Sequence, residues 1–582
     1  MSMDRRRGNG MDGQAIAGLV GVILVVAVLA VVWIAVKAGS AIDGVNPGLG
    51  VDPFAIAFGL VKGKVAWPAS STWILVLELA ALAAAGIAYA VLRSRRGTKR
   101  TTTDSAAKFM GRGKALSALT AGGARATAAR LGVTHWLGVP IGVTVAGRMP
   151  LYGSAEDMHI DVWGPRTGKS SSRAIPAILT APGAVLATSN KRDLVDATRD
   201  LRAEVGKVWV FDPQRIALEN ATWWWNPLSY VVDDVKAAKL AECFAAGSRS
   251  GGGGDSKYFD IAGQNLLAGF LLAAALDHRP ITDVFTWTTR PGDDAAVLIL
   301  KRHGYTQMAD AVDGEVNGEQ RRRDSVYATA SQMASCLKVR AIAEWVTPVG
   351  SMAGDQRPQF DPHAFARAQD TLYSLSKEGK GTAGPLTTAL TMATVEAAEE
   401  LATTLPGGRL SRPLLGVLDE AANVCRWHDL PDLYSHFGSR GIILMTFLQS
   451  WSQGVEVWGR EGMRKLWSAS NIAVYGGGVR EPEFLNELSQ MVGDFDKHTL
   501  STNVGRGTRS TSYGKQRERT LDIADLAALP RGRAIVFASG APGTLVETRP
   551  WMAGPHAAAV RASIAAHDPS HDPTQGFLET SR

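Results

Sequence analysis

Residues 163–172 read Trp-Gly-Pro-Arg-Thr-Gly-Lys-Ser-Ser-Ser, and this stretch decides the fold class of the 582-residue chain. An apolar pair, Ile160 and Val162, precedes the stretch, and the apolar-periodic run 174–179 follows it. This order predicts a strand, a phosphate-binding loop and a helix. Backbone N–H groups at the start of a helix attract phosphate oxygens, and the helix dipole adds to that attraction.

The loop has the residues that bind ATP and Mg²⁺ in P-loop proteins, but its spacing differs. Lys169 would place a positive charge at the β and γ phosphates, and Ser170 would ligate Mg²⁺. The usual motif has four residues between its glycines, whereas Gly164 and Gly168 enclose three, and Trp163 occupies the outer position. The loop is therefore one residue shorter or enters at a different angle, and a Gly-rich turn capped by Ser170 is the alternative. The residues expected to contact the nucleotide are Gly164, Pro165, Arg166, Thr167, Gly168, Lys169, Ser170 and Ser171.

A second motif is an apolar strand that ends in two acids, Leu-Leu-Gly-Val-Leu-Asp-Glu at residues 414–420. In P-loop ATPases the first acid holds the Mg²⁺ shell and the neighbouring Glu polarises the attacking water. We therefore expect Asp419 to serve the metal and Glu420 to be the general base. A plain helix cap is the alternative, but the Gly-Lys-Ser segment roughly 250 residues earlier favours the catalytic interpretation.

Two further candidates flank the apolar run 442–448. Gln449 follows this run, at the carboxyl end of a predicted strand, where parallel sheets bind ligands. It would sense the γ phosphate or the attacking water; a strand-end amide bonded to a loop is the alternative. Arg440 precedes the run, and in a ring of subunits it would neutralise transition-state charge at the neighbour's nucleotide. An ordinary surface salt bridge is the alternative for Arg440.

The N-terminal region predicts a membrane anchor. Residues 15–36 carry no charge over 22 positions, enough to cross a bilayer and too long for the apolar part of a signal peptide. A second apolar run covers 73–92. Lys and Arg are densest beside these runs, whereas the loop 38–72 carries only two lysines. Because Lys and Arg collect on the cytoplasmic side of a membrane, we expect both termini in the cytoplasm. The protein itself is expected in the inner (cytoplasmic) membrane of the cell.

The distribution of charged residues and of cysteines limits the kinds of partner and site that the chain can have. The net charge of +7 is concentrated between residues 93 and 130, which hold ten Lys or Arg and one acid. Such a basic belt suits anionic lipid headgroups or nucleic acid, and solvated surface is the alternative. The three cysteines are far apart, which argues against a disulfide framework or a zinc ribbon.

Alternating short strands and helices predict an α/β fold with a mostly parallel sheet covered on both faces. The run 494–519 is polar and basic, and predicts a mobile loop. The expected parts are a membrane anchor (1–100), a basic membrane-proximal helical connector (101–134), a nucleotide-binding domain (135–231 and 346–555), an inserted all-α domain (232–345) and a disordered tail (556–582).

This order of features resembles the conjugative type IV coupling proteins, the TraG/TraD-like ATPases of type IV secretion. The resemblance covers about residues 15–540. The features that carry it are the paired spans, Gly-Pro-Arg-Thr-Gly-Lys-Ser, Asp212-Pro213, Asn226-Pro-Leu228, the helical insert, the Leu-Asp-Glu strand end and Leu448-Gln-Ser450.

The resemblance implies a RecA-like motor domain and an all-α domain that receives a relaxase–DNA substrate. It also implies a hexameric ring and ATP-driven passage of single-stranded DNA to a type IV secretion channel. The resemblance implies that Lys169 is the family's phosphate-loop lysine and Ser170 its Mg²⁺ ligand. It also implies that Asp419 and Glu420 are the family's acidic pair and that Gln449 is its glutamine. Arg440 is nearest to the family's arginine finger but does not align cleanly.

Two alternatives remain open at this point. An FtsK-type translocase would act on duplex DNA, but that family usually has more spans and a terminal winged-helix reader, for which the tail after residue 555 is short. A membrane scaffold with a degenerate phosphate loop would bind ATP weakly or not at all. ATP turnover with and without single-stranded DNA distinguishes the motor from the scaffold.

Overall fold

The computed structural model describes residues 13–45, 52–64, 67–95, 102–133, 136–248, 255–350, 354–379, 382–505 and 508–571. The chain divides into two compact units, Met1–Arg100 and Thr101–Arg582. We call them the N-terminal unit and the C-terminal unit.

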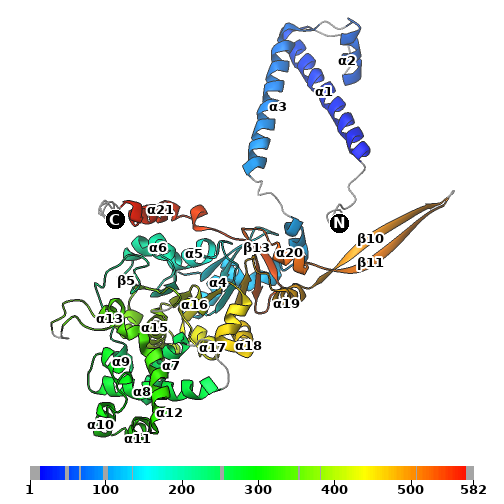
Figure 1. Ribbon diagram of the computed structural model, residues 1–582. Helices are drawn as coiled ribbons and strands as arrows, with labels where there is room; N and C mark the ends of the chain where they lie inside the picture. The colour runs from blue at the N-terminus through cyan, green and yellow to red at the C-terminus, as the bar shows by residue number, and fades with distance from the viewer. Residues whose placement is uncertain are drawn as a thin grey trace, which may run out of the picture. The chain divides into compact units, whose positions relative to one another are not determined.

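The N-terminal unit is a helical hairpin with a short third helix (Figure 1). Its helices are α1 (Gly13–Asp43), α2 (Pro53–Val61) and α3 (Ala69–Arg95). The hairpin helices α1 and α3 approach closely at Gly39, where an added Cβ would lie 2.1 Å from Ser71 Oγ. Small residues allow this kind of backbone approach between apolar helices.

The two predicted spans, 15–36 and 73–92, lie on α1 and α3. By length and composition, windows in three of the described helices would cross a membrane: Val26–Asp43, Ala69–Gly86 and Tyr258–Leu276. The third window belongs to the C-terminal unit, where 61% of it is buried inside the protein. It is therefore a core helix of that unit, and the other two windows lie on α1 and α3, the helices of the two predicted spans.

The C-terminal unit is built on one 11-stranded sheet. Across the sheet the strands follow the order β2 (Pro150–Gly153), β1 (Val139–Thr144), β13 (Thr544–Glu547), β12 (Arg533–Ala538), β9 (Ile472–Tyr475), β3 (His159–Val162), β8 (Ile442–Leu448), β7 (Leu414–Leu418), β4 (Val185–Ser189), β6 (Thr371–Leu375) and β5 (Val208–Phe211). From β9 to β5 every neighbouring pair is parallel. The remaining four strands extend the sheet in antiparallel fashion. This topology confirms the predicted α/β fold with a mostly parallel sheet.

The central strands of the sheet carry apolar side chains on both faces, and helices cover both faces and bury these side chains. All seven residues of β8 are buried, and alternate side chains pack into different cores. Ile443, Met445 and Phe447 join the core that includes α5 (Ile175–Thr180) and α6 (Asp193–Ala203). Ile442 and Leu444 join the core on the other face. A continuous apolar run is typical of a parallel strand buried on both sides.

Between β5 and β6 the described chain is helical over most of its length. Its α-helices are α7 (Asp234–Ser248), α8 (Asp255–Leu276), α9 (Thr282–Thr288), α10 (Ala295–Arg302), α11 (Thr306–Val316), α12 (Gln320–Met333), α13 (Arg340–Val346) and α14 (Pro362–Arg367). The two ends of this helical region are joined by aromatic packing. Trp223 contacts Trp209 of β5 on one side and Trp345 of α13 on the other, and Trp225 N donates to Trp345 O at 2.9 Å.

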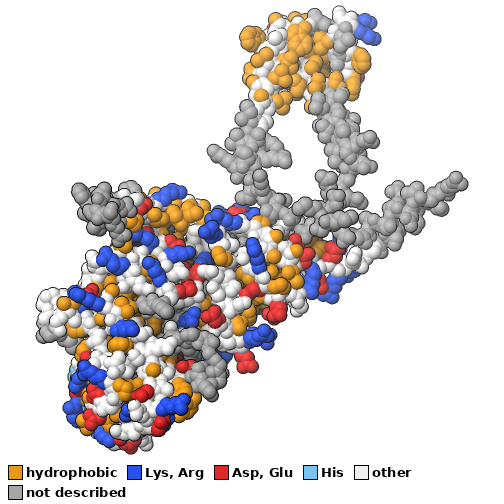
Figure 2. Space-filling model, viewed as in Figure 1, with side chains coloured by type: hydrophobic (Ala, Val, Ile, Leu, Met, Phe, Trp, Pro, Cys, Tyr) orange, Lys and Arg blue, Asp and Glu red, His pale blue; other side chains and the backbone are white. Residues whose placement is uncertain are grey.

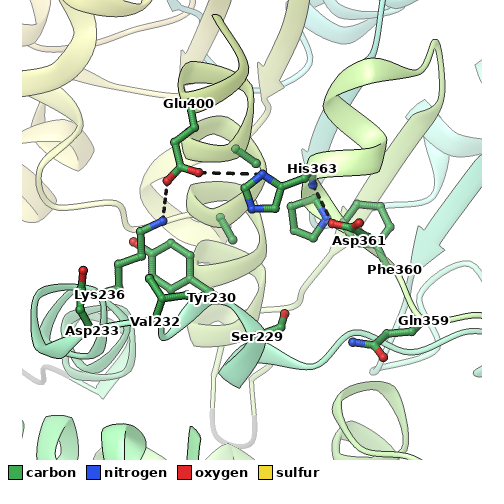
Figure 3. A pocket seen from close by; sticks show the side chains of 13 residues that line it. Ser229, Tyr230, Val232, Asp233, Lys236, Gln359, Phe360, Asp361, His363 and Glu400 are labelled. Atoms are coloured by element: carbon green, nitrogen blue, oxygen red, sulfur yellow. Dashed lines mark hydrogen bonds and ion pairs between the residues drawn. The ribbon is translucent and has the colours of Figure 1, made fainter. Parts of the chain in front are cut away.

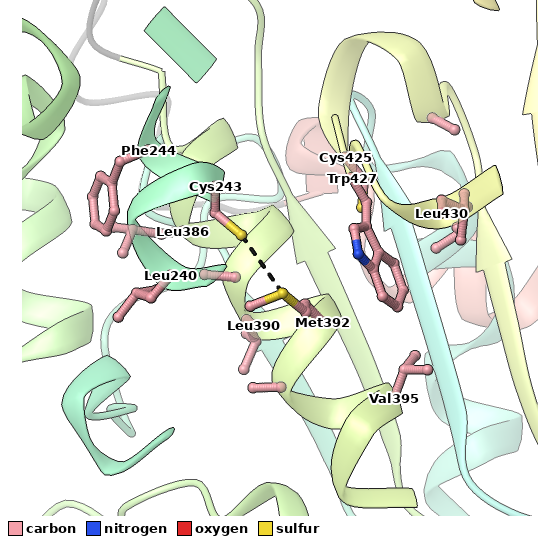
Figure 4. Packing of buried hydrophobic residues seen from close by; sticks show 14 of the residues in the cluster. Leu240, Cys243, Phe244, Leu386, Leu390, Met392, Val395, Cys425, Trp427 and Leu430 are labelled. Atoms are coloured by element: carbon pink, nitrogen blue, oxygen red, sulfur yellow. Dashed lines mark hydrogen bonds between the residues drawn. The ribbon is translucent and has the colours of Figure 1, made fainter. Parts of the chain in front are cut away.

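The helical region is also fixed to the sheet layer through α7. Figure 4 shows Leu240, Cys243 and Phe244 of α7 against Leu386 and Met392 of α15 (Gly384–Thr404). Cys243 Sγ lies 3.9 Å from Met392 Sδ. All three cysteines of the chain are buried and free.

Two sequence-based predictions are wrong. The predicted mobile loop 494–519 forms a hairpin, β10 (Asp494–Gly505) with β11 (Thr508–Arg519), because paired backbone hydrogen bonds stabilise a strand even when its side chains are polar. The predicted disordered tail contains α21 (Ala557–Ala566), which packs on α6 and donates from Ser563 Oγ to Asp196 O. The tail residues 572–582 lie outside the described part.

The predicted basic connector is folded into the C-terminal unit over residues 102–133. It consists of two 3₁₀ helices, Thr102–Phe109 and Gly113–Leu119, and of α4 (Ala121–Arg130). Asp104 accepts two hydrogen bonds from the Arg533 guanidinium of β12, at 2.7 and 3.0 Å. Both side chains are nearly buried, so this ion pair attaches the segment to the sheet.

Candidate nucleotide-binding site

The phosphate loop leaves β3 and crosses the carboxyl edge of the sheet. Its first peptides are held by neighbouring strand ends: Trp163 N donates to Leu448 O, and Gly164 N to Gly477 O, each at 2.9 Å. A Cβ added to Gly164 would lie 2.3 Å from Gly478 O. A glycine is therefore required at 164 because the backbone of another loop approaches it closely.

The rest of the loop turns back on itself. Thr167 Oγ1 donates to Gly164 O at 2.6 Å, and Gly168 has a φ of +100°, which only glycine adopts readily. Arg166 also has a positive φ, 61°, in the region that non-glycine residues seldom occupy. Pro165 and Arg166 are exposed. Residues 164–168 thus form an open loop whose backbone can surround a phosphate.

Trp163 explains the missing outer glycine. Its side chain is fully buried in a core with Leu116, Leu119 and Val474. A Cβ at Gly476 would lie 2.0 Å from the Trp163 ring, so the glycines that follow β9 leave room for the indole. Trp163, which occupies the position of the usual outer glycine, therefore anchors the loop through its buried side chain.

The helix after the loop begins with a π-helical turn, Ser170–Ala174, a feature that is frequent at functional sites. Ser171 Oγ donates to Gly168 O at 3.1 Å. The Ser170 hydroxyl makes no hydrogen bond to any described residue and lies at the mouth of the helix. It is thus placed where the sequence predicts the Mg²⁺ ligand.

A buried ion pair fixes this turn against β3. Arg173 Nε donates to Asp161 Oδ1 at 2.9 Å, and both side chains are fully buried. Arg173 also contacts His159 Nδ1 at 3.1 Å. Burial, and then the neighbouring guanidinium, hold the pKa of His159 well below its usual value, so this histidine is neutral at physiological pH. The same Asp161 accepts from Trp163 Nε1 at 3.2 Å.

Lys169 contacts both acids of the second motif. Its Nζ lies 3.0 Å from Asp419 Oδ1 and also contacts Glu420 Oε1. Burial alone would lower the pKa of Lys169, but the two carboxylates outweigh burial and raise the pKa. Burial raises the pKa of Asp419 to about 6, although Lys169 opposes that shift. At pH 7 the lysine is charged and most of Asp419 is ionised.

Glu420 stands at a sharp turn between β7 and the short helix α16 (Ala421–Val424). Its φ is 54°, a left-handed conformation that costs energy for any residue except glycine and is found at functional sites. Gln449 Nε2 donates to Glu420 Oε2 at 2.6 Å. The Glu420 carboxylate is therefore oriented by Lys169 on one oxygen and by Gln449 on the other.

These contacts follow from the strand order, since β8 lies between β3 and β7. The loop after β3, Gln449 after β8 and the acids after β7 all leave the same edge of a parallel sheet. Residues 169, 419, 420 and 449 are thus brought together, as predicted from sequence.

Arg440 is not brought to this site within one chain. It ends α17 (Leu430–Arg440) just before β8 begins, at the opposite edge of the sheet, and its Nη1 donates to Gly408 O at 3.2 Å. A role at the nucleotide of a neighbouring subunit stays a prediction.

Sequence reasoning missed three supports of the loop: the glycines 476–478, Asp161 and Arg173. The triple glycine after an apolar strand was a readable signal for close backbone approach. The buried ion pair had a weaker signal, an acid inside the apolar run before the loop and a base four residues after Lys169.

The site fits a nucleotide with Mg²⁺. The glycine cradle and the helix start offer backbone N–H groups, Lys169 offers a fixed cation, and Ser170 with Asp419 offers the oxygen ligands that Mg²⁺ prefers. One residue fewer in the loop does not disturb Lys169, because its helix is fixed to β3 by the Arg173–Asp161 pair.

A hollow of about 660 Å³ lies elsewhere, between the helical region and α15 (Figure 3). In it, Lys236 Nζ lies 2.6 Å from Glu400 Oε1, and His363 Nδ1 lies 3.9 Å from Glu400 Oε2. Tyr230 OH donates to the nearby Glu396 at 2.8 Å. These polar contacts join α7, α14 (Pro362–Arg367) and α15, and include none of the predicted site residues.

Solved structures with a similar fold include those of conjugative coupling proteins. The bacterial conjugative coupling protein TrwBdeltaN70, in an unbound monoclinic form, has 19% identity and a TM-score of 0.52, over 70% of this chain and 88% of its own. The plasmid coupling protein TrwB in complex with ADP and Mg²⁺ has 20% identity and a TM-score of 0.51, over 70% and 88%. At this identity the likeness shows the fold. No sequence among curated proteins matches the chain significantly.

A sequence profile described as the TraM recognition site of TraD and TraG matches residues 413–531. The profile covers 119 of the 582 residues, so the similarity to TraD and TraG is shown for this segment. The matched segment begins just before β7 and ends just before β12. It includes both site acids, Gln449 and the β10–β11 hairpin.

Proposed function

We propose that this protein is a coupling protein, a membrane-anchored ATPase that couples a relaxase–DNA substrate to a type IV secretion channel and drives its transfer by ATP hydrolysis. The observation that carries the proposal is the contact of Lys169 Nζ with Asp419, 3.0 Å away, and with Glu420. A lysine from a glycine cradle and two strand-end acids meet at the edge where parallel sheets bind ligands. Solved structures of the plasmid coupling protein TrwB include complexes with ADP and Mg²⁺ and with a non-hydrolysable ATP analogue.

Each residue of the site has a chemical role in this proposal. Bound ATP with Mg²⁺ would supply the phosphoanhydride bond and the divalent charge. Lys169 would neutralise negative charge on the β and γ phosphates, and Ser170 and Asp419 would hold the metal and its water shell. Glu420 accepts a proton from the attacking water at the carboxylate that Gln449 orients.

The remaining parts of the proposal concern assembly and placement. The helical region, about residues 232–345, receives the substrate, and single-stranded DNA with its relaxase and the secretion channel are the partners. The subunits form a hexamer, in which Arg440 of one subunit acts at the nucleotide of the next. The N-terminal helices span the inner membrane with both termini in the cytoplasm, which the basic residues beside them favour.

The test is ATP turnover by the full-length protein in vesicles, with no DNA, with single-stranded DNA and with duplex DNA. We expect turnover that single-stranded DNA stimulates and that Lys169→Ala abolishes. Lys465→Ala is the matched control, since Lys465 pairs with Asp432 on the surface. Stimulation by duplex DNA alone would favour an FtsK-type translocase. A rate equal to that of Lys169→Ala would leave the scaffold alternative, which the shortened loop motivates.

A further inference from the structure

The short helix α2, between the two membrane helices, has an unusual composition. Its nine residues read Pro-Phe-Ala-Ile-Ala-Phe-Gly-Leu-Val and include no polar side chain. Asp52 caps its start by accepting from Phe54 N at 2.9 Å, and Lys62 caps its end. At 1.5 Å per residue the helix is about 13 Å long, far short of the roughly 30 Å of a bilayer core. It cannot cross a membrane.

Among the side chains of α2 that the structure describes, one face is covered by protein and another is exposed. Ile56 and Gly59 are buried, and α2 packs on α1. Phe54 and Phe58, four residues apart and hence on one side of the helix, are 56% and 65% exposed. Two large aromatic side chains facing water on a helix that is otherwise apolar would be unfavourable.

The exposed face of α2 continues an apolar surface on the neighbouring helices. Ile42 of α1 and Trp73, Val76 and Leu77 of α3 are exposed as well, and hydrophobic side chains cover the described part of this hairpin (Figure 2). On α3 such residues lie in a window apolar enough to cross a membrane. The surface is therefore one that contacts lipid, and α2 extends it.

The polar residues around α2 mark a membrane boundary. Lys62 and Lys64 are exposed directly after the helix, where long cationic side chains reach from the apolar layer to the headgroups. Trp67 follows, and its Nε1 donates to Thr72 Oγ1 at 2.9 Å. Tryptophan is enriched at the interface between lipid and water. The order Asp52, apolar helix, lysines and tryptophan is that of a segment that enters a leaflet and returns.

We propose that α2 is a third membrane-embedded helix that does not span. Its Phe54 and Phe58 face lies among the acyl chains of the leaflet on the side where α1 and α3 are joined, and its two ends lie at the headgroups. This inference goes beyond the proposed ATPase function and does not depend on it. The occupant of the exposed face is lipid, because the face is continuous with the lipid-facing surface of the spans.

Single cysteines in the full-length protein, reconstituted alone in phosphatidylcholine vesicles, test this. The three native cysteines are buried, so a fluorophore attached at Phe58→Cys reports one position. Leu82→Cys, on the exposed face of α3, is the control for lipid, and Lys64→Cys is the control for water. Phe54→Cys gives a second reading of the same face.

We expect the label at residue 58 to be quenched by nitroxide-bearing lipid, as at residue 82, and to be protected from a water-soluble quencher. The label at residue 64 should show the reverse. If residues 54 and 58 behave like residue 64, the face is in water, and the proposal is overturned in favour of a protein partner absent from the vesicles. If Phe58→Cys crosslinks between chains and loses lipid quenching, a second copy covers the face, and the proposal is overturned as well.

Discussion

Replacing Glu420 with glutamine tests the proposed catalytic chemistry with the smallest change in shape. The substitution keeps the side-chain volume and removes the carboxylate that would accept the proton from water. Lys169 keeps its 3.0 Å contact with Asp419, so the cation that binds phosphates stays in place. We therefore expect ATP binding to survive and turnover to fall.

The size of the effect follows from the lost groups. Removing a general base typically slows a reaction by about 10²–10⁴-fold. The new amide would set an NH₂ group against either Lys169 or Gln449, whichever oxygen it replaces, and a hydrogen bond lost at a buried site costs about 1–3 kcal/mol. Domains are typically stable by about 5–15 kcal/mol, so the variant should still fold, and the loss of the base should slow turnover more than tenfold in folded protein.

The assay measures the binding of a fluorescent ATP analogue and the steady-state turnover of the same preparation. Glu456→Gln is the matched control, because that side chain is 68% exposed and the chemical change is identical. Binding and turnover of the control should equal those of the unaltered protein. Normal hydrolysis by Glu420→Gln would refute the reasoning, and Glu420 would then be a turn residue at the strand end.

Three other predictions concern the support of the site. Gly164→Ala should weaken ATP binding at least tenfold, since its Cβ would lie 2.3 Å from a backbone oxygen. Gly122→Ala on α4 should not weaken it, since its Cβ would make only an ordinary contact, 3.7 Å from Thr120 Oγ1. Equilibrium binding of both variants checks this. The kcat/KM for ATP should fall as the pH drops through about 6, because Asp419, whose pKa is raised to about 6, then loses the charge that would hold Mg²⁺. A pH–rate profile that is flat across this value would contradict this prediction. Asp161→Asn leaves the buried Arg173 without its counter-charge and should cost about 3–5 kcal/mol of stability, seen as a lower urea midpoint; an unchanged midpoint would show that the pair adds nothing.

The parallel sheet and the meeting of the motifs were predictable from sequence for a physical reason. A phosphate loop and an acid pair that follow apolar strands must leave one edge of a parallel sheet. Gln449 was predictable on the same grounds, since it also follows an apolar strand. Periodicity and strand polarity therefore predict this part of the site without any knowledge of distances.

The supports of the loop depend on pairings that the sequence does not encode locally. Gly164 needs to be glycine because Gly478, more than 300 residues later, lies against it. Trp163 replaces a glycine because its indole fills a space beside Gly476. Such packing is decided by which strands become neighbours, here β3 and β9, and composition does not reveal that.

The hairpin and the C-terminal helix were missed for a related reason. Most residues of β10 and β11 are polar, and the strands are joined by backbone hydrogen bonds and by ion pairs such as Lys497–Glu518, which leave no apolar period in the sequence. α21 is short and rich in alanine, and it is ordered by its contact with α6 through Ser563. Tertiary contacts stabilise a helix that its own sequence marks only weakly.

The central claim is that Lys169, Asp419, Glu420 and Gln449 surround one magnesium-bound triphosphate. A structure of the full-length protein with Mg²⁺ and a non-hydrolysable ATP analogue measures this directly. The account predicts Lys169 on the phosphates, Asp419 within reach of the metal shell, and Glu420 facing the terminal phosphate from the side of the attacking water. A triphosphate bound at any other place, or bound with Lys169 still paired to both acids, would contradict it.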